Sequence, residues 1–184
     1  QAAMRRLVDE DGVVAMLLAM NSESLLEVAA SLDALETPAI ALIATHPEVV
    51  EGSGSIAQLP FNDVTQSTVA ALFVRDELLI KRAAVFADLD NPHSRYLKEN
   101  FEQKFLSTGG ELTGSHAVSE VSDALLRHLE ASDTELLYLP LSARETLEVT
   151  SVLEEIGWNP EIMSTDGLLA SMLGEFPDRV NELE

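Results

Sequence analysis

The sequence predicts an α/β protein built on doubly wound parallel sheets. Short apolar segments alternate along the chain with segments in which apolar residues recur at the period of a helix. Several of the short segments are apolar at every position, which is typical of strands buried on both faces. Repeated strand–helix–strand units of this kind form parallel sheets with right-handed crossovers.

The expected strands are the short apolar segments at residues 13–20, 39–44, 83–87, 111–118, 135–140 and 161–164. The first expected helix carries apolar side chains from Leu25 to Leu35, and a capping box of Ser24 and Glu27 is its expected start. Two later helices are expected to end at glycines, one at Gly109 and one at Gly157.

A break in the pattern near residues 59–66 separates two expected lobes. We place part of a first lobe at residues 1–60 and a second lobe at residues 61–184. The loop GSGS at residues 52–55 precedes this break. It lacks a following lysine and leads into a strand instead of a helix, so it is not a phosphate-binding loop.

Charge and composition exclude several functions. The 184 residues carry 11 basic and 32 acidic side chains, a net charge of −21 that is spread along the chain and disfavours nucleic acid as a partner. The absence of cysteine excludes disulfides, thiolate metal sites and a cysteine nucleophile. The four histidines lack metal-ligand spacing, so we expect neither a metal nor a cofactor. No apolar run is long enough to span a bilayer, and the chain contains no signal peptide.

Polar residues that follow the strands are the candidate binding residues, because open parallel sheets bind ligands outside the carboxyl ends of their strands. These residues include Ser22, Thr45, His93, Ser142 and Asp166. Ser22 at the start of a helix would favour an anion such as a carboxylate. Asp166, from the other half of the chain, would face a cation. Together they suit a zwitterion, which is the form of a free amino acid.

Each of these residues also has a structural interpretation. A serine at a helix start is commonly an N-cap, and the sequence Thr45-His46-Pro47 is compatible with an ordinary turn. Asp166 and Gly167 form a common turn pair. The sequence leaves these alternatives open.

An enzymatic alternative rests on the segment AVFADLDN at residues 84–91, an apolar strand followed by Asp-x-Asp. It resembles the nucleophile motif of haloacid-dehalogenase-type phosphatases, in which Asp88 would attack phosphorus with magnesium bound. Pro92 stands where that family has threonine or valine, and no later acidic pair is present to hold magnesium.

An ordered set of motifs resembles the type I periplasmic solute-binding proteins, in the leucine/isoleucine/valine-binding branch. The set covers nearly the whole chain in the family's order. Its members are LAMNSES at 18–24, TPAIALIATHPE at 37–48, PFNDVTQ at 60–66, DLDNPHSRYL at 88–97, FLSTGGEL at 105–112 and STDG at 164–167. The resemblance implies a two-lobed fold of which this chain is a fragment, with the first lobe incomplete and the closing segment missing.

The resemblance also implies a function, namely binding of an amino acid or a similar small carboxylate in the cleft between the lobes for an ABC transporter. Ser22, Ala44 and Thr45 would hold the α-carboxylate and α-amine of the ligand, and Asp166 would pair with its ammonium group. His93 and Ser142 stand where the family commonly has aromatic contacts, which implies a smaller aromatic surface around the side chain of the ligand.

The mechanism that the resemblance implies is hinged closure of the lobes around residues 60–63, without catalysis. The expected partners are a small-molecule ligand and a membrane permease, and the expected location is periplasmic or extracellular. Two further interpretations are the ligand-sensing region of a receptor or regulator and a scaffold whose cleft no longer binds.

Overall fold

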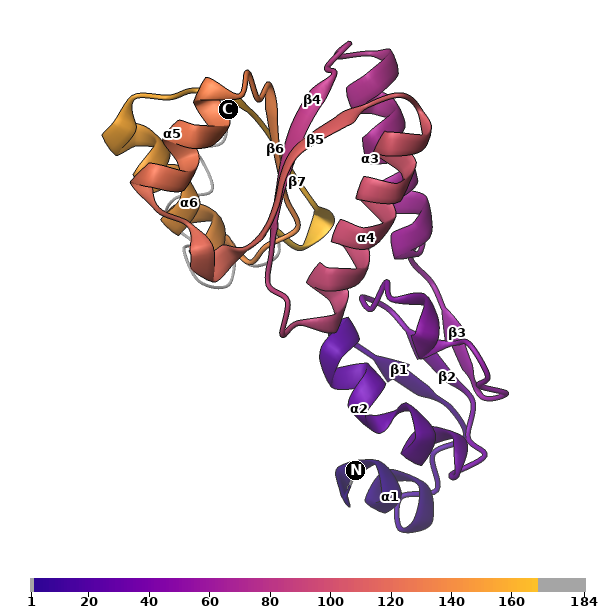
Figure 1. The fold of residues 1–184 in the computed structure, drawn as a ribbon. Coiled ribbons are helices and arrows are strands. Elements are labelled where there is room, and N and C mark those ends of the chain that lie inside the picture. The colour runs from indigo at the N-terminus through magenta and orange to yellow at the C-terminus, as the bar shows by residue number, and fades with distance from the viewer. Residues whose placement is uncertain (1, 169–184) are drawn as a thin grey trace. The chain divides into compact units, whose positions relative to one another are not determined.

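The computed structural model describes residues 2–168 (Figure 1). The chain divides into two compact units, unit 1 at Gln1–Gln66 and unit 2 from Ser67 onward. Each unit contains one parallel sheet. The α/β fold class with parallel sheets is therefore confirmed.

Unit 1 contains a three-stranded sheet in the order β1-β2-β3. Its elements are α1 (Ala2–Asp9), β1 (Met16–Leu18), α2 (Ser22–Asp33), β2 (Ala39–Ala41), the 3₁₀ helix η1 (Pro47–Val49) and β3 (Ile56–Gln58). The buried side chains of the three strands form one core with Leu25 and Leu32 of α2, Val49 of η1 and, partly buried, Val8 of α1. All helical elements that precede β3 therefore contribute to the core on one face of this sheet.

Unit 2 contains a four-stranded sheet in the order β5-β4-β6-β7. Helix α3 (Asp63–Asp76) crosses the boundary between the units in sequence. The later elements are β4 (Arg82–Ala87), α4 (Pro92–Ser107), β5 (Glu111–Ala117), η2 (Val118–Glu120), α5 (Asp123–Ala131), β6 (Leu136–Leu139), α6 (Ala143–Ile156) and β7 (Glu161–Ser164).

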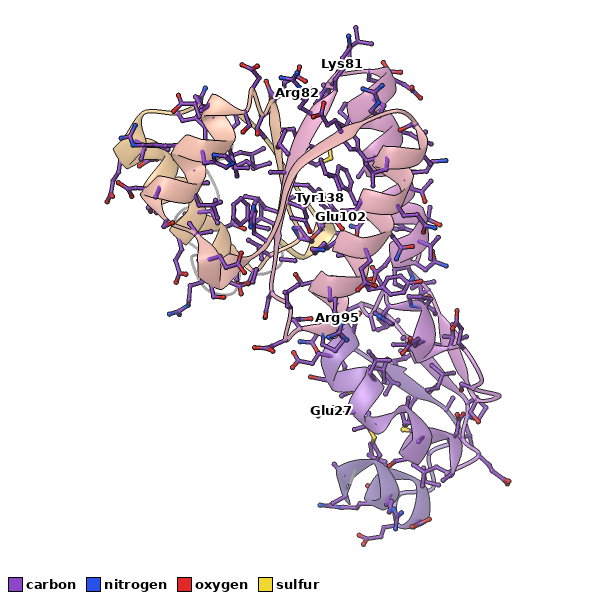
Figure 2. All side chains as sticks on the ribbon, in the orientation of Figure 1. Glu27, Lys81, Arg82, Arg95, Glu102 and Tyr138 are labelled. Atoms are coloured by element: carbon purple, nitrogen blue, oxygen red, sulfur yellow. The ribbon has the colours of Figure 1, made fainter. Side chains whose placement is uncertain are left out.

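Both faces of this second sheet are covered, as expected for a doubly wound sheet (Figure 1). On one face, Val85 and Tyr138 pack with side chains of α3 and α4. Tyr138, which is labelled in Figure 2, stacks on Phe101 of α4 with ring centroids 4.0 Å apart. On the other face, Phe86 and Leu137 pack with side chains of α5 and α6.

The predicted strands are confirmed, with shorter bounds than those predicted at residues 13–20, 39–44, 111–118 and 135–140 and an earlier start, at Arg82, for the strand predicted at 83–87. The predicted glycine ends are also confirmed: Gly157 directly follows α6, Gly109 follows Thr108 at the end of α4, and both glycines have positive φ values. The predicted capping box of Ser24 and Glu27 is wrong. Helix α2 begins earlier because Asn21 caps it, accepting a 2.9 Å hydrogen bond from the Ser24 N–H.

Candidate functional site

Ser22 joins the carboxyl ends of β1 and β2 in unit 1. It is the first residue of α2, directly after the Asn21 cap, and is 5% exposed. Its Oγ accepts hydrogen bonds from the backbone N–H groups of Thr45 at 3.1 Å and His46 at 3.2 Å. Two residues that the sequence predicted as binding residues, Ser22 and Thr45, are thus in direct contact.

Three donor groups at this edge, two hydroxyls and one backbone N–H, have no acceptor among residues 2–168. The Ser22 hydroxyl accepts two hydrogen bonds there but donates none. The side-chain hydroxyl of Thr45 and the backbone N–H of Ala44 also have no hydrogen-bond partner within this described range. Thr45 and Ala44 are both buried. An O–H whose oxygen already accepts two N–H donors is polarised toward donation, because hydrogen bonds in chains strengthen one another.

Two residues outside the predicted binding set, Gln58 and His46, hold this loop in place. The Gln58 side chain donates to the carbonyl oxygens of Ala44 at 2.7 Å and His46 at 3.4 Å. His46 is buried, and its Nδ1 accepts from the Glu48 N–H at 3.3 Å. Gln58 is the last residue of β3, so the same rule of polar residues at strand ends applies to it.

In unit 2, a buried serine connects the carboxyl ends of β4 and β6. Ser94 Oγ accepts from the Asp88 N–H at 2.9 Å and donates to the Pro140 carbonyl at 2.6 Å. After β4 the chain continues into α4 on one face, and after β6 into α6 on the other face. A crevice at such a reversal of direction is the usual ligand position in open α/β sheets. Sequence analysis did not single out Ser94.

The remaining three predicted residues follow β4, β6 and β7, which are neighbouring strands, so their backbones lie at one edge of the unit 2 sheet. His93 is half-buried in the first turn of α4. Ser142 caps α6, and its hydroxyl donates to the Glu145 carboxylate at 2.7 Å in a full capping box. Asp166 is exposed just after β7. The Ser142 hydroxyl is therefore already used by a structural hydrogen bond.

The Asp-x-Asp segment after β4 forms a local turn. Asp88 Oδ1 accepts from the Asp90 N–H at 3.0 Å, and Asp90 is exposed. Within residues 2–168, no group of three or more His, Cys, Asp or Glu side chains is arranged to hold a metal ion. No described helix has the length and apolar character needed to cross a membrane.

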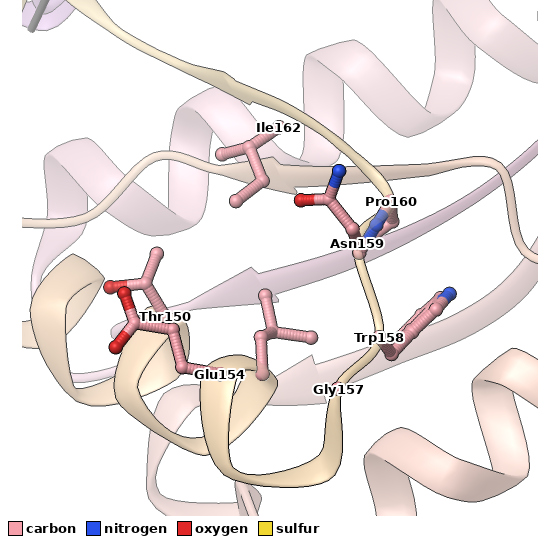
Figure 3. A pocket seen from close by; sticks show the side chains of 8 residues that line it. Thr150, Glu154, Gly157, Trp158, Asn159, Pro160 and Ile162 are labelled. Atoms are coloured by element: carbon pink, nitrogen blue, oxygen red, sulfur yellow. The ribbon is translucent and has the colours of Figure 1, made fainter.

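A cavity of about 350 Å³ lies at the opposite edge of the unit 2 sheet (Figure 3). It is lined by the last turns of α6, by residues 157–160 and by Ile162 of β7. None of the predicted binding residues lines it. Near the same edge, Arg82 starts β4 (Figure 2), and its hydrogen bond to Asp133 together with the nearby Glu111 carboxylate raises the pKa of this guanidinium above its ordinary value.

A comparison with protein family models identifies the family of the chain. The family model described as "Periplasmic binding protein" matches residues 1–175. The chain belongs to the periplasmic binding protein family. The resemblance inferred from the motifs is thereby confirmed. Among proteins with curated descriptions, none matches the sequence.

Solved structures of binding proteins share the fold at low sequence identity. The leucine-binding protein LivK of Thermotoga maritima has a TM-score of 0.80 and 23% identity, over 93% of this chain and 50% of that one. LivJ of Streptococcus pneumoniae, in complex with isoleucine, has a TM-score of 0.78 and 18% identity, over 90% of this chain and 48% of that one. A Rhodopseudomonas palustris solute-binding protein with 4-hydroxybenzoate has a TM-score of 0.74 and 19% identity, over 91% and 47%. The chain thus spans about half the length of these proteins.

Proposed function

We propose that the chain is part of a solute-binding protein that delivers an amino acid, or a similar small carboxylate, to an ABC transporter. The observation that carries the proposal is the Ser22 hydroxyl, which is held by two backbone N–H groups and has no acceptor of its own among the described residues. A ligand carboxylate is a suitable acceptor for it, with the Thr45 hydroxyl and the Ala44 N–H as further donors.

The donors of unit 1 are neutral, which bears on the class of ligand. The only basic residues before position 67 are Arg5 and Arg6, both in α1. The proposed carboxylate site therefore relies on hydroxyl and N–H donors and the first turn of α2, a type of site that binds anions without a formal positive charge.

The carboxyl edge of the unit 2 sheet carries acidic groups instead. Asp88 and Asp90 follow β4, and Asp166 follows β7. We propose that Asp166 pairs with the ammonium group of the ligand, with His93 and Ser142 lining the ligand on the same edge. A ligand with both a carboxylate and an ammonium group would have complementary groups at the edges of both sheets. A benzoate would have them only at the edge of the unit 1 sheet. Isoleucine is bound by one of the solved proteins and 4-hydroxybenzoate by another.

The proposed mechanism is hinged closure of the lobes around the ligand, with the hinge near residues 60–63 and no covalent step. The proposal places the protein in the periplasm or outside the cell, with a membrane permease as the protein that receives the ligand. Family membership and the structural matches to transporter binding proteins support this role.

The test is a thermal-shift screen of the polypeptide as the cell produces it, against the twenty amino acids and a set of benzoates. A ligand at 100 times its dissociation constant stabilises the folded state by about 2.7 kcal/mol if it binds that state alone. We expect an amino acid to give this shift. The shift is expected to disappear in Asp166→Asn and to persist in the control Asp90→Asn, which removes a carboxylate charge from the same sheet edge.

Each other result has a definite meaning. A shift with benzoates alone would retain solute binding but contradict the amino-acid assignment. A shift that survives in Asp166→Asn would contradict the proposed contact between Asp166 and the ammonium group of the ligand. No shift with any compound in the screen would contradict the proposal as a whole.

A further inference from the structure

His46 is a buried histidine that holds a turn of unit 1 in its neutral form. Its side chain caps η1, where Nδ1 accepts a hydrogen bond from the Glu48 N–H at 3.3 Å, and the residue is 3% exposed. A ring nitrogen that accepts from an N–H group carries no proton, so the proton of this imidazole lies on Nε2. The contact therefore specifies the uncharged side chain.

The backbone of His46 belongs to the same loop as the donors of the unit 1 edge. Its N–H donates to Ser22 Oγ at 3.2 Å, and its carbonyl oxygen accepts from the Val49 N–H at 3.2 Å. Val49 is buried in the core of unit 1. A displacement of His46 therefore disturbs the contact with Ser22 and the packing of η1 together.

The charged side chains on the helical elements joined to this loop are acidic. Helix α2 meets the loop through Ser22, η1 continues from it, and the Asp63 N–H at the start of α3 donates to the Thr45 carbonyl at 3.0 Å. In unit 1 these elements carry Glu23, Glu27, Asp33, Glu48 and Asp63. Residues 7–74 contain no lysine or arginine, so no fixed positive charge in this stretch opposes protonation of the imidazole.

Protonation replaces the capping contact by two opposed donors. Histidine gains a proton between about pH 8 and 5, and at His46 that proton goes to Nδ1. Nδ1–H and the Glu48 N–H then point at each other, and a buried N–H without an acceptor is unfavourable, as is a buried charge without a partner. The new Nδ1–H reaches an acceptor, such as a carboxylate, only if the ring leaves the η1 cap.

We propose that His46 makes the loop of residues 44–49 sensitive to acid: the neutral imidazole holds the loop against Ser22, and protonation opens it. The same loop carries the Thr45 and Ala44 donors assigned to the ligand carboxylate, so acid would also weaken solute binding. That consequence rests on the proposed function, whereas the opening of the loop does not.

Hydrogen exchange measures this opening directly. The polypeptide as the cell produces it is compared with its His46→Asn variant, by mass spectrometry of peptides that cover residues 44–51, at about pH 7.5 and about pH 5. Asparagine is a favoured N-cap residue, so the variant keeps an acceptor for the Glu48 N–H but does not titrate. The other three histidines of these 184 residues lie in unit 2 and are present in both proteins. His46→Ser repeats the comparison if the asparagine variant does not fold.

At the higher pH we expect equal exchange rates in the two proteins. At the lower pH the loop of the wild-type protein should exchange at least about tenfold faster than that of the variant, since each pH unit favours the protonated, opened loop by up to about tenfold. A ratio of rates that does not change with pH would overturn the proposal. Slower exchange of the wild-type loop at the lower pH would also overturn it, because the charged imidazole would then hold the loop. A thermal-shift screen without a hit would contradict the proposed function and leave this comparison intact.

Discussion

Replacement of Ser22 by alanine tests the central contact of the unit 1 edge. The change removes the acceptor of the Thr45 N–H and an acceptor of the His46 N–H, and both residues are 3% exposed. A buried donor left without a partner costs about 1–3 kcal/mol. Because the Thr45 N–H loses its partner, the His46 N–H loses this acceptor and the loop relaxes in part, we expect a loss of about 2–4 kcal/mol in the free energy of unfolding of unit 1.

The single tryptophan makes the assay specific. Trp158 lies in unit 2, so its fluorescence in a urea titration follows that unit, while far-UV circular dichroism follows both. For an m-value of about 2 kcal/mol/M, the expected loss moves the unit 1 transition to lower urea by roughly 1–2 M. The circular dichroism curve of Ser22→Ala should therefore change more than its tryptophan curve.

Ser24→Ala is the matched control. Ser24 lies in the same turn of α2, and its hydroxyl makes no hydrogen bond within residues 2–168. Its replacement should change stability by no more than about 0.5 kcal/mol. If Ser22→Ala and Ser24→Ala behave alike, the two N–H groups do not depend on the Ser22 hydroxyl, and the reasoning about this edge is refuted.

Three further substitutions test unit 2, each followed by urea unfolding with Trp158 fluorescence. Ser142→Ala removes the N-cap of α6 and should cost about 1 kcal/mol; an unchanged midpoint would show that the cap is dispensable. Gly157→Ala should cost about 1 kcal/mol through strain alone, because φ is +74° and no atom of residues 2–168 lies within 4 Å of the new Cβ. Gly110→Ala places a Cβ 2.5 Å from the buried Phe105 ring and should cost about 1–3 kcal/mol, and equal stability would mean that the ring moves freely.

The fold was predictable from the sequence because its signals are local. The buried strands β4 and β6 are apolar at nearly every position, and Gly157 directly follows the last helical residue of α6. Such features depend on residues close together in the chain. The bounds of β1 were predicted too long because apolar character extends past the three residues that pair with β2.

The site was only partly predictable because its decisive contacts join residues far apart in sequence. The Ser22 hydroxyl meets N–H groups 23 and 24 residues later, and Ser94 meets the Pro140 carbonyl 46 residues later. The strand-end rule located Ser22 and Thr45 but could not show that they bond to each other. It missed Gln58 because the short strand β3 was not given bounds from the sequence.

Ser22 and Ser94 show how the carboxyl edges of the two sheets differ in hydrogen bonding. Each is a buried serine in the first turn of the helix after the first strand of its sheet, and each joins that strand end to the loop after a neighbouring strand. Ser94 both accepts and donates within the fold, so its hydroxyl is fully used there. Ser22 accepts twice and, among the described residues, keeps its proton available. This asymmetry supports the proposal that the Ser22 hydroxyl donates to a ligand carboxylate, because its proton has no acceptor among the described residues.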